Sequence, residues 1–153
     1  MGELQGRVAI ITGAGRGIGR EHALLFAAEG AKVVVNDLGG ANDGTGTDAT
    51  PAQEVVNEIK AMGGEAVANY DNVADWEGAQ RMVNMAVETF GDLDILVNNA
   101  GILRDRVLVN MTEAEWDAVI QVHLKGHFAP SRWAAAYWRE QHKAGVTKPR
   151  NIV

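Results

Sequence analysis

Short apolar runs rich in β-branched residues alternate along the chain with longer segments in which apolar residues recur at helical spacing. The runs at 7–12, 32–37 and 94–98 show little polar alternation, as strands covered on both faces should. Another run lies at 65–70, and residues 151–153 resemble the start of a fifth strand. This alternation predicts βαβ units and therefore an α/β fold built on a parallel sheet.

The helices expected between these runs have recognisable ends. Thr50 and Pro51 predict an N-cap followed by a first helical residue, and Gly63-Gly64 predicts where that helix ends. Asp75 is placed to cap the next helix, which Gly91 should end. One apolar stripe marks the buried face of this second helix: Ala79, Met82, Val83, Ala86, Val87 and Phe90.

A further helical segment opens at Thr112, where Thr112 and Glu115 have the spacing of a capping box. Pro130 is expected to kink or interrupt this helix. Its apolar residues are expected to point inward: Trp116, Val119, Ile120, Leu124 and Phe128. Three later aromatic residues in helical pattern are expected in the core or at a subunit interface: Trp133, Tyr137 and Trp138.

The segment 38–49 is polar and rich in glycine, and it is too long for an ordinary connection, so we expect a mobile surface loop. Neither an internal repeat nor a shift in composition divides the chain. Residues 1–153 are therefore expected to belong to a single domain.

Composition restricts the classes of function. The 153 residues carry 14 Lys+Arg against 20 Asp+Glu, a net charge of −6, and no Cys. Disulfides, thiolate metal sites and cysteine nucleophiles are excluded, and no metal site is predicted. Without a basic block or an apolar run near the roughly 18 residues of a membrane span, we expect neither a nucleic-acid nor a membrane partner. A cytoplasmic location is the expectation.

A glycine-rich turn follows the first strand, with Gly13, Gly17 and Gly19 separated by three residues and by one. The apolar residues Ile18, Leu25, Phe26 and Ala27 then predict that the chain continues from this turn as a helix. Between a strand and a helix, such glycines allow a tight turn, a close approach of backbone N–H groups to a pyrophosphate, and close packing of the helix. The positive end of the helix dipole adds to this attraction. The turn predicts a dinucleotide site.

Asp37 closes the second strand, eighteen residues after Gly19. A carboxylate there can accept hydrogen bonds from both hydroxyls of an adenosine ribose, and its charge would repel a 2′-phosphate. This favours NAD over NADP. Arg16 is the counter-argument, since a cation in the turn could pair with that phosphate, but Leu38 rather than a base follows Asp37. The alternative is a glycine-rich turn with an unrelated surface carboxylate.

The glycine spacing, together with Asn98-Asn99-Ala100-Gly101 after the fourth strand, resembles the short-chain dehydrogenase/reductase family over essentially the whole chain. The resemblance implies a doubly wound parallel sheet (Rossmann), with strand order 3-2-1-4-5, and a homo-oligomer, dimer or tetramer. Several stretches are similar to the (3R)-hydroxyacyl-CoA dehydrogenase domain of multifunctional β-oxidation enzymes: 35–40, 68–71, 98–106 and 122–124.

The resemblance also implies roles for individual residues. Asn72 would face the exocyclic amine of adenine, where the family more often has Asp, and the Val73 backbone would face the ring. Asn99, Ala100 and Gly101 would lie along the ribose and nicotinamide of the cofactor.

His123 stands where the family usually has an Asn that supports a water in a proton relay. An imidazole could take part in such a relay, or it could be a partly buried side chain held by backbone groups. Arg104 and Arg106 begin a loop near the expected substrate entrance and could meet a CoA phosphate. Alternatively, they are solvated charges or an inter-subunit contact.

The resemblance implies chemistry by a Ser and a Tyr-x-x-x-Lys motif that both lie downstream of the fifth strand, and this sequence contains neither of them there. Tyr70 and Tyr137 are the only tyrosines, and Ala74 and Gln141 follow them at the position of the Lys. We therefore expect the NAD-binding portion of a longer enzyme, truncated after the start of the fifth strand. This portion should bind a dinucleotide without turning over substrate on its own.

The function expected for the longer enzyme is NAD-dependent hydride transfer between nicotinamide and a secondary alcohol or ketone, such as a 3-hydroxyacyl-CoA. Two other functions stay open. One is a non-catalytic dinucleotide-binding module. The other is an NADP-dependent 3-oxoacyl reductase.

Overall fold

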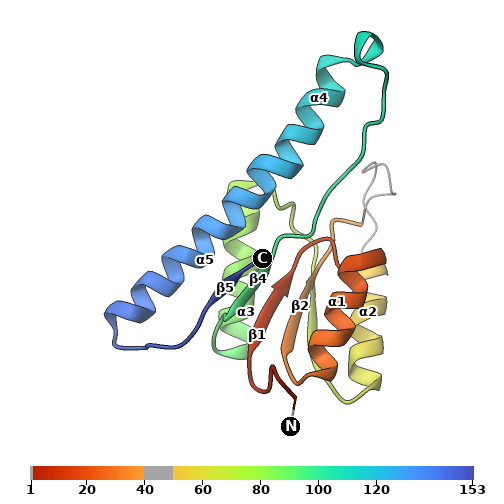
Figure 1. Ribbon diagram of the computed structural model, residues 1–153. Coiled ribbons are helices and arrows are strands. Elements are labelled where there is room, and N and C mark those ends of the chain that lie inside the picture. Colours follow the sequence, from red (N-terminus) through yellow and green to blue (C-terminus); the bar gives the residue numbers. More distant parts are fainter. Residues whose placement is uncertain (1, 40–49) are drawn as a thin grey trace.

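A single parallel sheet forms the centre of the molecule in the computed structural model, which describes residues 2–39 and 50–153. Its five strands lie in the order β3-β2-β1-β4-β5, which confirms the predicted order (Figure 1). The strands are β1 (Val8–Ile11), β2 (Lys32–Asn36), β3 (Glu65–Asn69), β4 (Ile95–Val97) and β5 (Asn151–Ile152).

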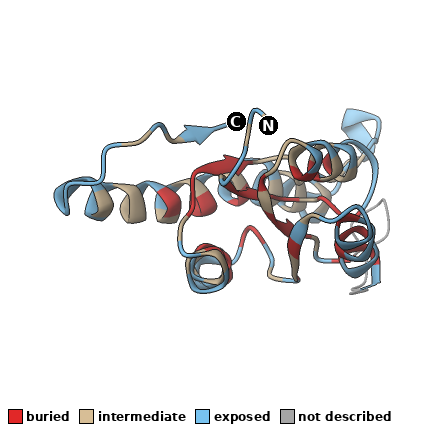
Figure 2. Ribbon diagram, turned by 90° about the horizontal axis from the view of Figure 1, so that it is seen from below, coloured by how far each residue is buried: buried red, intermediate tan, exposed pale blue. Residues whose placement is uncertain are grey.

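Helices cover both faces of the sheet. They are α1 (Gly17–Ala28), α2 (Thr50–Ala61), α3 (Trp76–Phe90), α4 (Glu113–Ile120) and α5 (Gly126–Lys143), with a 3-10 turn at Leu108–Asn110 and a π turn at Gln121–Lys125. Side chains alternate along β1, so that Ala9 and Ile11 pack in the core under α1 and α2, whereas Val8 and Ile10 pack under α3 and α5. Buried residues therefore concentrate on the strands and on the helix turns that face them (Figure 2). This arrangement confirms the doubly wound fold.

Most predicted helix ends are confirmed. The Asp75 carboxylate accepts a hydrogen bond from the Gly78 N–H at 2.7 Å, and Gly91 ends α3 with φ of 86°. Thr112 and Glu115 form the capping box at the start of α4. The second helix begins at Thr50 itself, one residue before the predicted position.

The interruption expected at Pro130 is wrong, because α5 continues through this residue. The irregularity lies one turn earlier, in the π turn that closes with a hydrogen bond from the Gly126 N–H to the Gln121 carbonyl. Gly126 is four residues before Pro130, so its carbonyl has no N–H to accept from at that position. The wider turn therefore lies directly before the helical turn that contains the proline.

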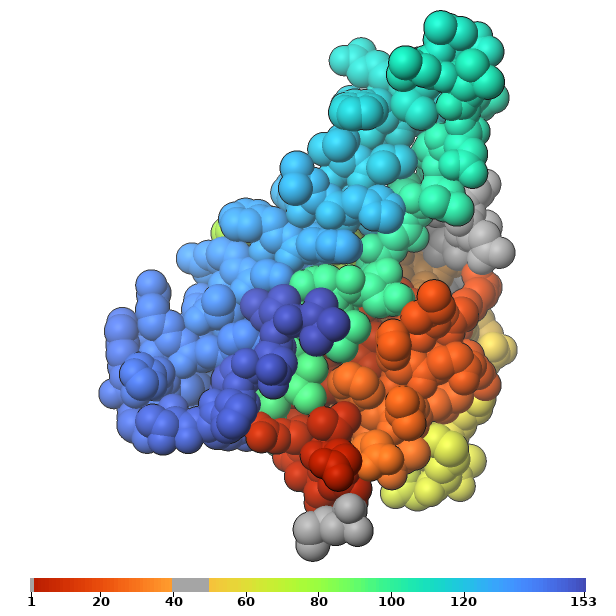
Figure 3. Space-filling view, in the orientation of Figure 1, coloured from red at the N-terminus to blue at the C-terminus, as the bar shows by residue number. Residues whose placement is uncertain are grey.

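The inward orientation expected for the apolar residues from Trp116 to Phe128 is also wrong for most of them. Trp116 is 57% exposed, Leu124 66% and Phe128 57%, and Ile120 is exposed as well, whereas Val119 is half-buried. The reason is that α4 extends past the carboxyl ends of the strands, so that the sheet does not cover it (Figures 1 and 3). Farther along, Trp133, Tyr137 and Trp138 do pack against the core.

Most of the glycine-rich loop expected at 38–49 lies outside the described residues. Within residues 2–39 and 50–153, no helix combines the length and the apolar character needed to cross a membrane.

Candidate functional site

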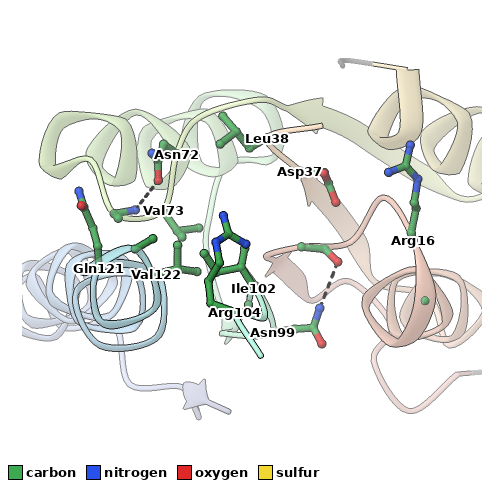
Figure 4. Close-up of a pocket in the computed structure, with 16 residues that line it drawn as sticks. Arg16, Asp37, Leu38, Asn72, Val73, Asn99, Ile102, Arg104, Gln121 and Val122 are labelled. Carbon is green, nitrogen blue, oxygen red and sulfur yellow. Dashed lines mark hydrogen bonds between the residues drawn. The ribbon is translucent and has the colours of Figure 1, made fainter. Parts of the chain in front are cut away.

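A cleft of about 500 Å³ opens at the carboxyl ends of the strands, beside β1 (Figure 4). The strand order reverses here, because β2 and β3 lie on one side of β1 and β4 and β5 on the other. In doubly wound sheets this is where ligands bind. Most of the predicted site residues line it: Gly13, Arg16, Gly17, Asp37, Asn72, Val73, Asn99, Ala100 and Gly101.

The glycines of the turn are required by its backbone geometry. Gly13 has φ of 62°, and a Cβ at this position would lie 2.8 Å from the Ala100 Cα. A Cβ at Gly19 would lie 2.3 Å from the Gly13 carbonyl oxygen and 2.4 Å from the Asn99 Nδ2. The absence of these side chains lets α1 and the end of β4 close on the turn, which leaves room for a ligand against the backbone.

The N-terminus of α1 faces this turn. Arg16 occupies the N-cap position, and the helix start has no hydrogen bond from a capping side chain. The first N–H groups of a helix lack intrahelical acceptors, so this end of α1 can donate to an anion. Two predicted site residues, Ile18 and Gly19, do not line the cleft. The Ile18 side chain is 71% exposed to solvent, and Gly19 is buried behind the turn.

Thr12 and Asn99 join the turn to the end of β4. The buried Thr12 Oγ1 accepts hydrogen bonds from the Asn99 and Ala100 N–H groups, both at 3.0 Å. The Asn99 Nδ2 donates to the Thr12 carbonyl at 3.0 Å and to the Gly13 carbonyl at 3.1 Å. Two walls of the cleft are therefore held at a fixed separation. Sequence reasoning missed this role of Thr12, although a hydroxyl directly before the first glycine was a visible signal.

Both oxygens of the Asp37 carboxylate are held by backbone groups. Oδ2 accepts from the Gly15 N–H at 2.9 Å, and Oδ1 accepts from the Gly39 N–H at 2.8 Å. Each carboxylate oxygen has a second lone pair, so the group can still accept two more hydrogen bonds. Asp37 is thus a fixed pair of acceptors at the rim of the cleft.

A polar network behind the cleft positions the loop after β3. The buried Asn36 donates from Nδ2 to the Asn69 Oδ1 at 2.8 Å and to the Asp71 carbonyl at 2.9 Å. Arg81 on α3 then donates from Nε and Nη2 to the Asp71 Oδ1, at 2.9 and 2.7 Å. No motif or spacing in the sequence indicates that these residues are connected. Together they fix the backbone that carries Asn72.

Asn72 and Val73 lie at the far end of the cleft from Arg16 (Figure 4). The Asn72 Oδ1 accepts a hydrogen bond from the Ala74 N–H at 2.8 Å. Val73 is buried against the helix at Gly126, where a Cβ would lie 2.8 Å from the Val73 Cγ2.

His123 lies beside the cleft and does not line it. Its Nε2 is 2.9 Å from the Ile102 carbonyl oxygen and 3.1 Å from the Ile102 backbone nitrogen. The ring covers Gly101, where a Cβ would lie 2.8 Å from the His123 Cε1. His127, one turn on, has its Nε2 3.2 Å from the Ala100 carbonyl oxygen. The two imidazoles hold the segment that leads from β4 along the cleft.

The cleft also has lining residues that were not predicted as cofactor ligands: Leu38, Ala74, Ile102, Arg104, Ala118, Gln121 and Val122. Three of them come from α4 and the π turn, at spacings i, i+3 and i+4, which put them on one helix face. Helical periodicity was visible in the sequence, but the face that meets the cleft depends on tertiary packing.

Neither tyrosine takes part in the cleft. The Tyr137 hydroxyl donates to the Asp92 Oδ1 at 3.0 Å, and the Tyr70 hydroxyl donates to the Gln53 Oε1 at 3.4 Å. Burial and the bond to Asp92 raise the pKa of Tyr137 to about 12, which is opposite to the shift that acid–base catalysis near neutral pH requires. No group of His, Asp and Glu in the described part of the chain could hold a metal ion.

Comparisons with known proteins agree with this geometry. Residues 7–147 match the family model described as short chain dehydrogenase. The chain is 56% identical over 137 residues to peroxisomal multifunctional enzyme type 2 of Drosophila melanogaster, covering 90% of this chain and 22% of that protein. It is 49% identical over 145 residues to hydroxyacyl-CoA dehydrogenase ChsB1 of Mycobacterium tuberculosis, covering 92% of this chain and 43% of that protein.

Among solved structures, the crystal structure of a short chain dehydrogenase from Mycobacterium avium superposes with a TM-score of 0.92 and 61% sequence identity. That match covers 99% of this chain and 52% of the other. The chain therefore spans about half the length of this relative and less than half the length of the other two. The glycine turn, the doubly wound sheet and the matched family model together show that the chain belongs to the short-chain dehydrogenase/reductase family.

Proposed function

We propose that the cleft binds NAD and that this chain supplies the cofactor side of a hydride transfer between nicotinamide and a secondary alcohol or ketone. The observation that carries the proposal is the placement of three elements around one cleft. These are the glycine turn, the uncapped N-terminus of α1 and the fixed carboxylate of Asp37.

The residues present fit a dinucleotide in one direction along the cleft. The pyrophosphate would lie against the turn at Gly13 and Gly17 and the first N–H groups of α1, including that of Ile18, with Gly19 allowing the close approach. The adenosine ribose would meet Asp37, and the adenine would lie at the end of the cleft that Asn72 and Val73 line. The nicotinamide end would follow the segment from Asn99 to Gly101.

Asp37 supports NAD rather than NADP as the cofactor. Its two oxygens are already fixed by backbone N–H groups and retain lone pairs for the two ribose hydroxyls. A 2′-phosphate at that place would bring like charges together. Arg16 is on the same side of the cleft, so the relative affinity for the two cofactors is the decisive measurement.

The bound cofactor would supply the hydride acceptor and donor, and the chain's residues would position it. Thr12 and Asn99 hold the wall beside the nicotinamide end, and His123 and His127 hold the backbone of Ala100 and Ile102. This geometry supports a positioning role for His123. We propose that residues 1–153 form the NAD-binding portion of a single Rossmann-fold domain. Proton transfer at the substrate oxygen is assigned to residues outside this portion.

The proposed substrate class is a 3-hydroxyacyl-CoA. Its support is the similarity to a relative named hydroxyacyl-CoA dehydrogenase. We also propose a homo-oligomer, dimer or tetramer, because α4, the π turn and the start of α5 expose a row of large apolar side chains. The cytoplasmic location stays a prediction, since one relative is named as peroxisomal.

The proposal is tested with the full-length protein, NAD and a 3-hydroxyacyl-CoA, by following the absorbance of reduced nicotinamide. We expect turnover that falls when Asp37 is replaced by Ala. Absence of turnover with every secondary alcohol tried, while NAD still binds, would instead support a non-catalytic dinucleotide-binding module.

A further inference from the structure

The Asn72 carboxamide, at the end of the cleft proposed for adenine, already uses its oxygen within its own loop. Its Oδ1 accepts from the Ala74 N–H at 2.8 Å. A backbone N–H can only donate, so the oxygen must face Ala74 and the Nδ2 group must face away from it. The exocyclic amine of adenine is itself a donor, so it cannot pair with the Nδ2 group and would have to share the Asn72 oxygen with the Ala74 N–H.

Gln121 brings a second carboxamide to the same end of the cleft. It starts the π turn, lines the cleft, and lies on the side of Asn72 and Val73, away from Asp37 and Arg16 (Figure 4). The side chain is exposed, and its carboxamide makes no hydrogen bond within the described part of the chain. Its Oε1 is therefore available as an acceptor.

Apolar residues line the cleft around Gln121. Ala118 and Val122 lie on the same helix face as Gln121, and Val73 and Ala74 line the cleft from the loop after β3. Small apolar groups on two sides suit the faces of a flat ring, and this leaves the ring's polar edge to the two carboxamides.

We propose that Gln121, rather than Asn72, reads the exocyclic amine of adenine, by accepting its hydrogen bond at Oε1. Asn72 keeps the donor that would pair with a carbonyl at the same ring position. The inference rests on the proposed binding of NAD, and it makes Gln121 a specificity-determining residue of that site.

The test compares NAD with nicotinamide hypoxanthine dinucleotide, which has a carbonyl oxygen in place of the exocyclic amine. Dissociation constants are measured by calorimetry on the full-length protein and its Gln121→Ala variant. We expect the variant to bind NAD about fivefold more weakly, the loss of one net hydrogen bond. It should bind the hypoxanthine dinucleotide within about twofold of the parent protein.

Two further variants sharpen the result. Gln121→Glu offers only acceptors, so it should weaken binding of the hypoxanthine dinucleotide relative to NAD. Gln141→Ala removes a glutamine from α5 away from the cleft and should change neither affinity. Equal unfolding midpoints for all variants show that the fold is intact.

Several outcomes would overturn the proposal. If Gln121→Ala binds NAD like the parent protein, or loses affinity for both dinucleotides equally, Gln121 does not read the amine. The proposed function would still stand, because NAD binds. If the parent protein binds neither dinucleotide, the proposed function fails and this assignment fails with it.

Discussion

At the scale of single residues, the cleft depends on side chains that hold backbone rather than ligand. Thr12, Asn99 and His123 each bond to main-chain groups of the segments that line the cleft. Such contacts determine how accurately a bound dinucleotide can be oriented, and small displacements of a reacting group have large effects on rate.

Replacing His123 by Ala should loosen the backbone at Gly101 and Ile102. We expect about a fivefold increase in the dissociation constant for NAD, measured by calorimetry, as for the loss of one hydrogen bond. A matched control is His142→Ala, since His142 is exposed in the last turn of α5 and should have no effect.

Turnover and its pH profile separate the two possible roles of His123. A positioning residue changes affinity with little change in the shape of the profile, whereas a relay residue removes one limb of it. Unchanged affinity together with unchanged turnover in His123→Ala would exclude both roles.

The sequence predicted which residues line the site better than it predicted the hydrogen bonds that those residues make. The spacing of Gly13, Gly19 and Asp37 was sufficient because only one chain path satisfies a strand, a glycine turn and a helix in that order. The hydrogen bond from Ala74 to the Asn72 oxygen could not be foreseen. It depends on the local turn after β3, and this turn is fixed by the distant Asn36 and Arg81.

At the scale of elements, local signals located helix ends well and helix surroundings poorly. A cap such as Asp75 needs only its own next three residues, so the sequence contains all of the information. The burial of Trp116 in α4 and of Leu124 in the π turn instead depends on which element covers these two segments. Periodicity shows that one face is apolar, but it does not show what covers that face. Pro130 likewise did not interrupt α5, and the sequence did not indicate the π turn before it.

The N-cap of α3 offers a direct test at this scale. Replacing Asp75 by Ala leaves the Gly78 N–H without its side-chain acceptor, and we expect a loss of about 1 kcal/mol in the free energy of unfolding. Urea denaturation of the full-length protein measures the change. Asn84→Ala, on the exposed side of the same helix, should cost less than half as much; equal losses would contradict the capping role.

At the scale of the whole molecule, an ion-pair cluster joins the edge strand to the rest of the sheet. Lys148 and Arg150, directly before β5, pair with Asp92 at 2.7 and 2.6 Å, and Lys148 also pairs with the buried Asp94 at 2.6 Å. Tyr137 on α5 donates to Asp92 as well. The cluster therefore links β4, β5 and α5 at the amino end of the sheet.

This cluster predicts a loss of stability in acid. Burial alone would raise the pKa of Asp92, but hydrogen bonds from Lys148 and Arg150 outweigh it and hold the pKa well below the ordinary 3.8. Because the folded state favours the ionised form, its contribution is complete above the unfolded pKa and is lost as pH falls below about 4.

Urea denaturation across pH 2–7 checks this prediction. Asp92→Asn should be less stable than the parent protein at pH 7, by about 2 kcal/mol, and should lose less stability in acid. Parallel curves for the two proteins would show that Asp92 does not carry the effect.

On the proposed function, the cleft holds a dinucleotide, and Asp37 binds the adenosine ribose of that dinucleotide. Calorimetric titration of the full-length protein with NAD and with NADP tests it most directly, with Asp37→Ala as the comparison. We predict that the parent protein binds NAD at least about tenfold more tightly than NADP and that the variant loses most of this preference. Tighter binding of NADP to the parent protein, or no binding of either cofactor, would contradict the account.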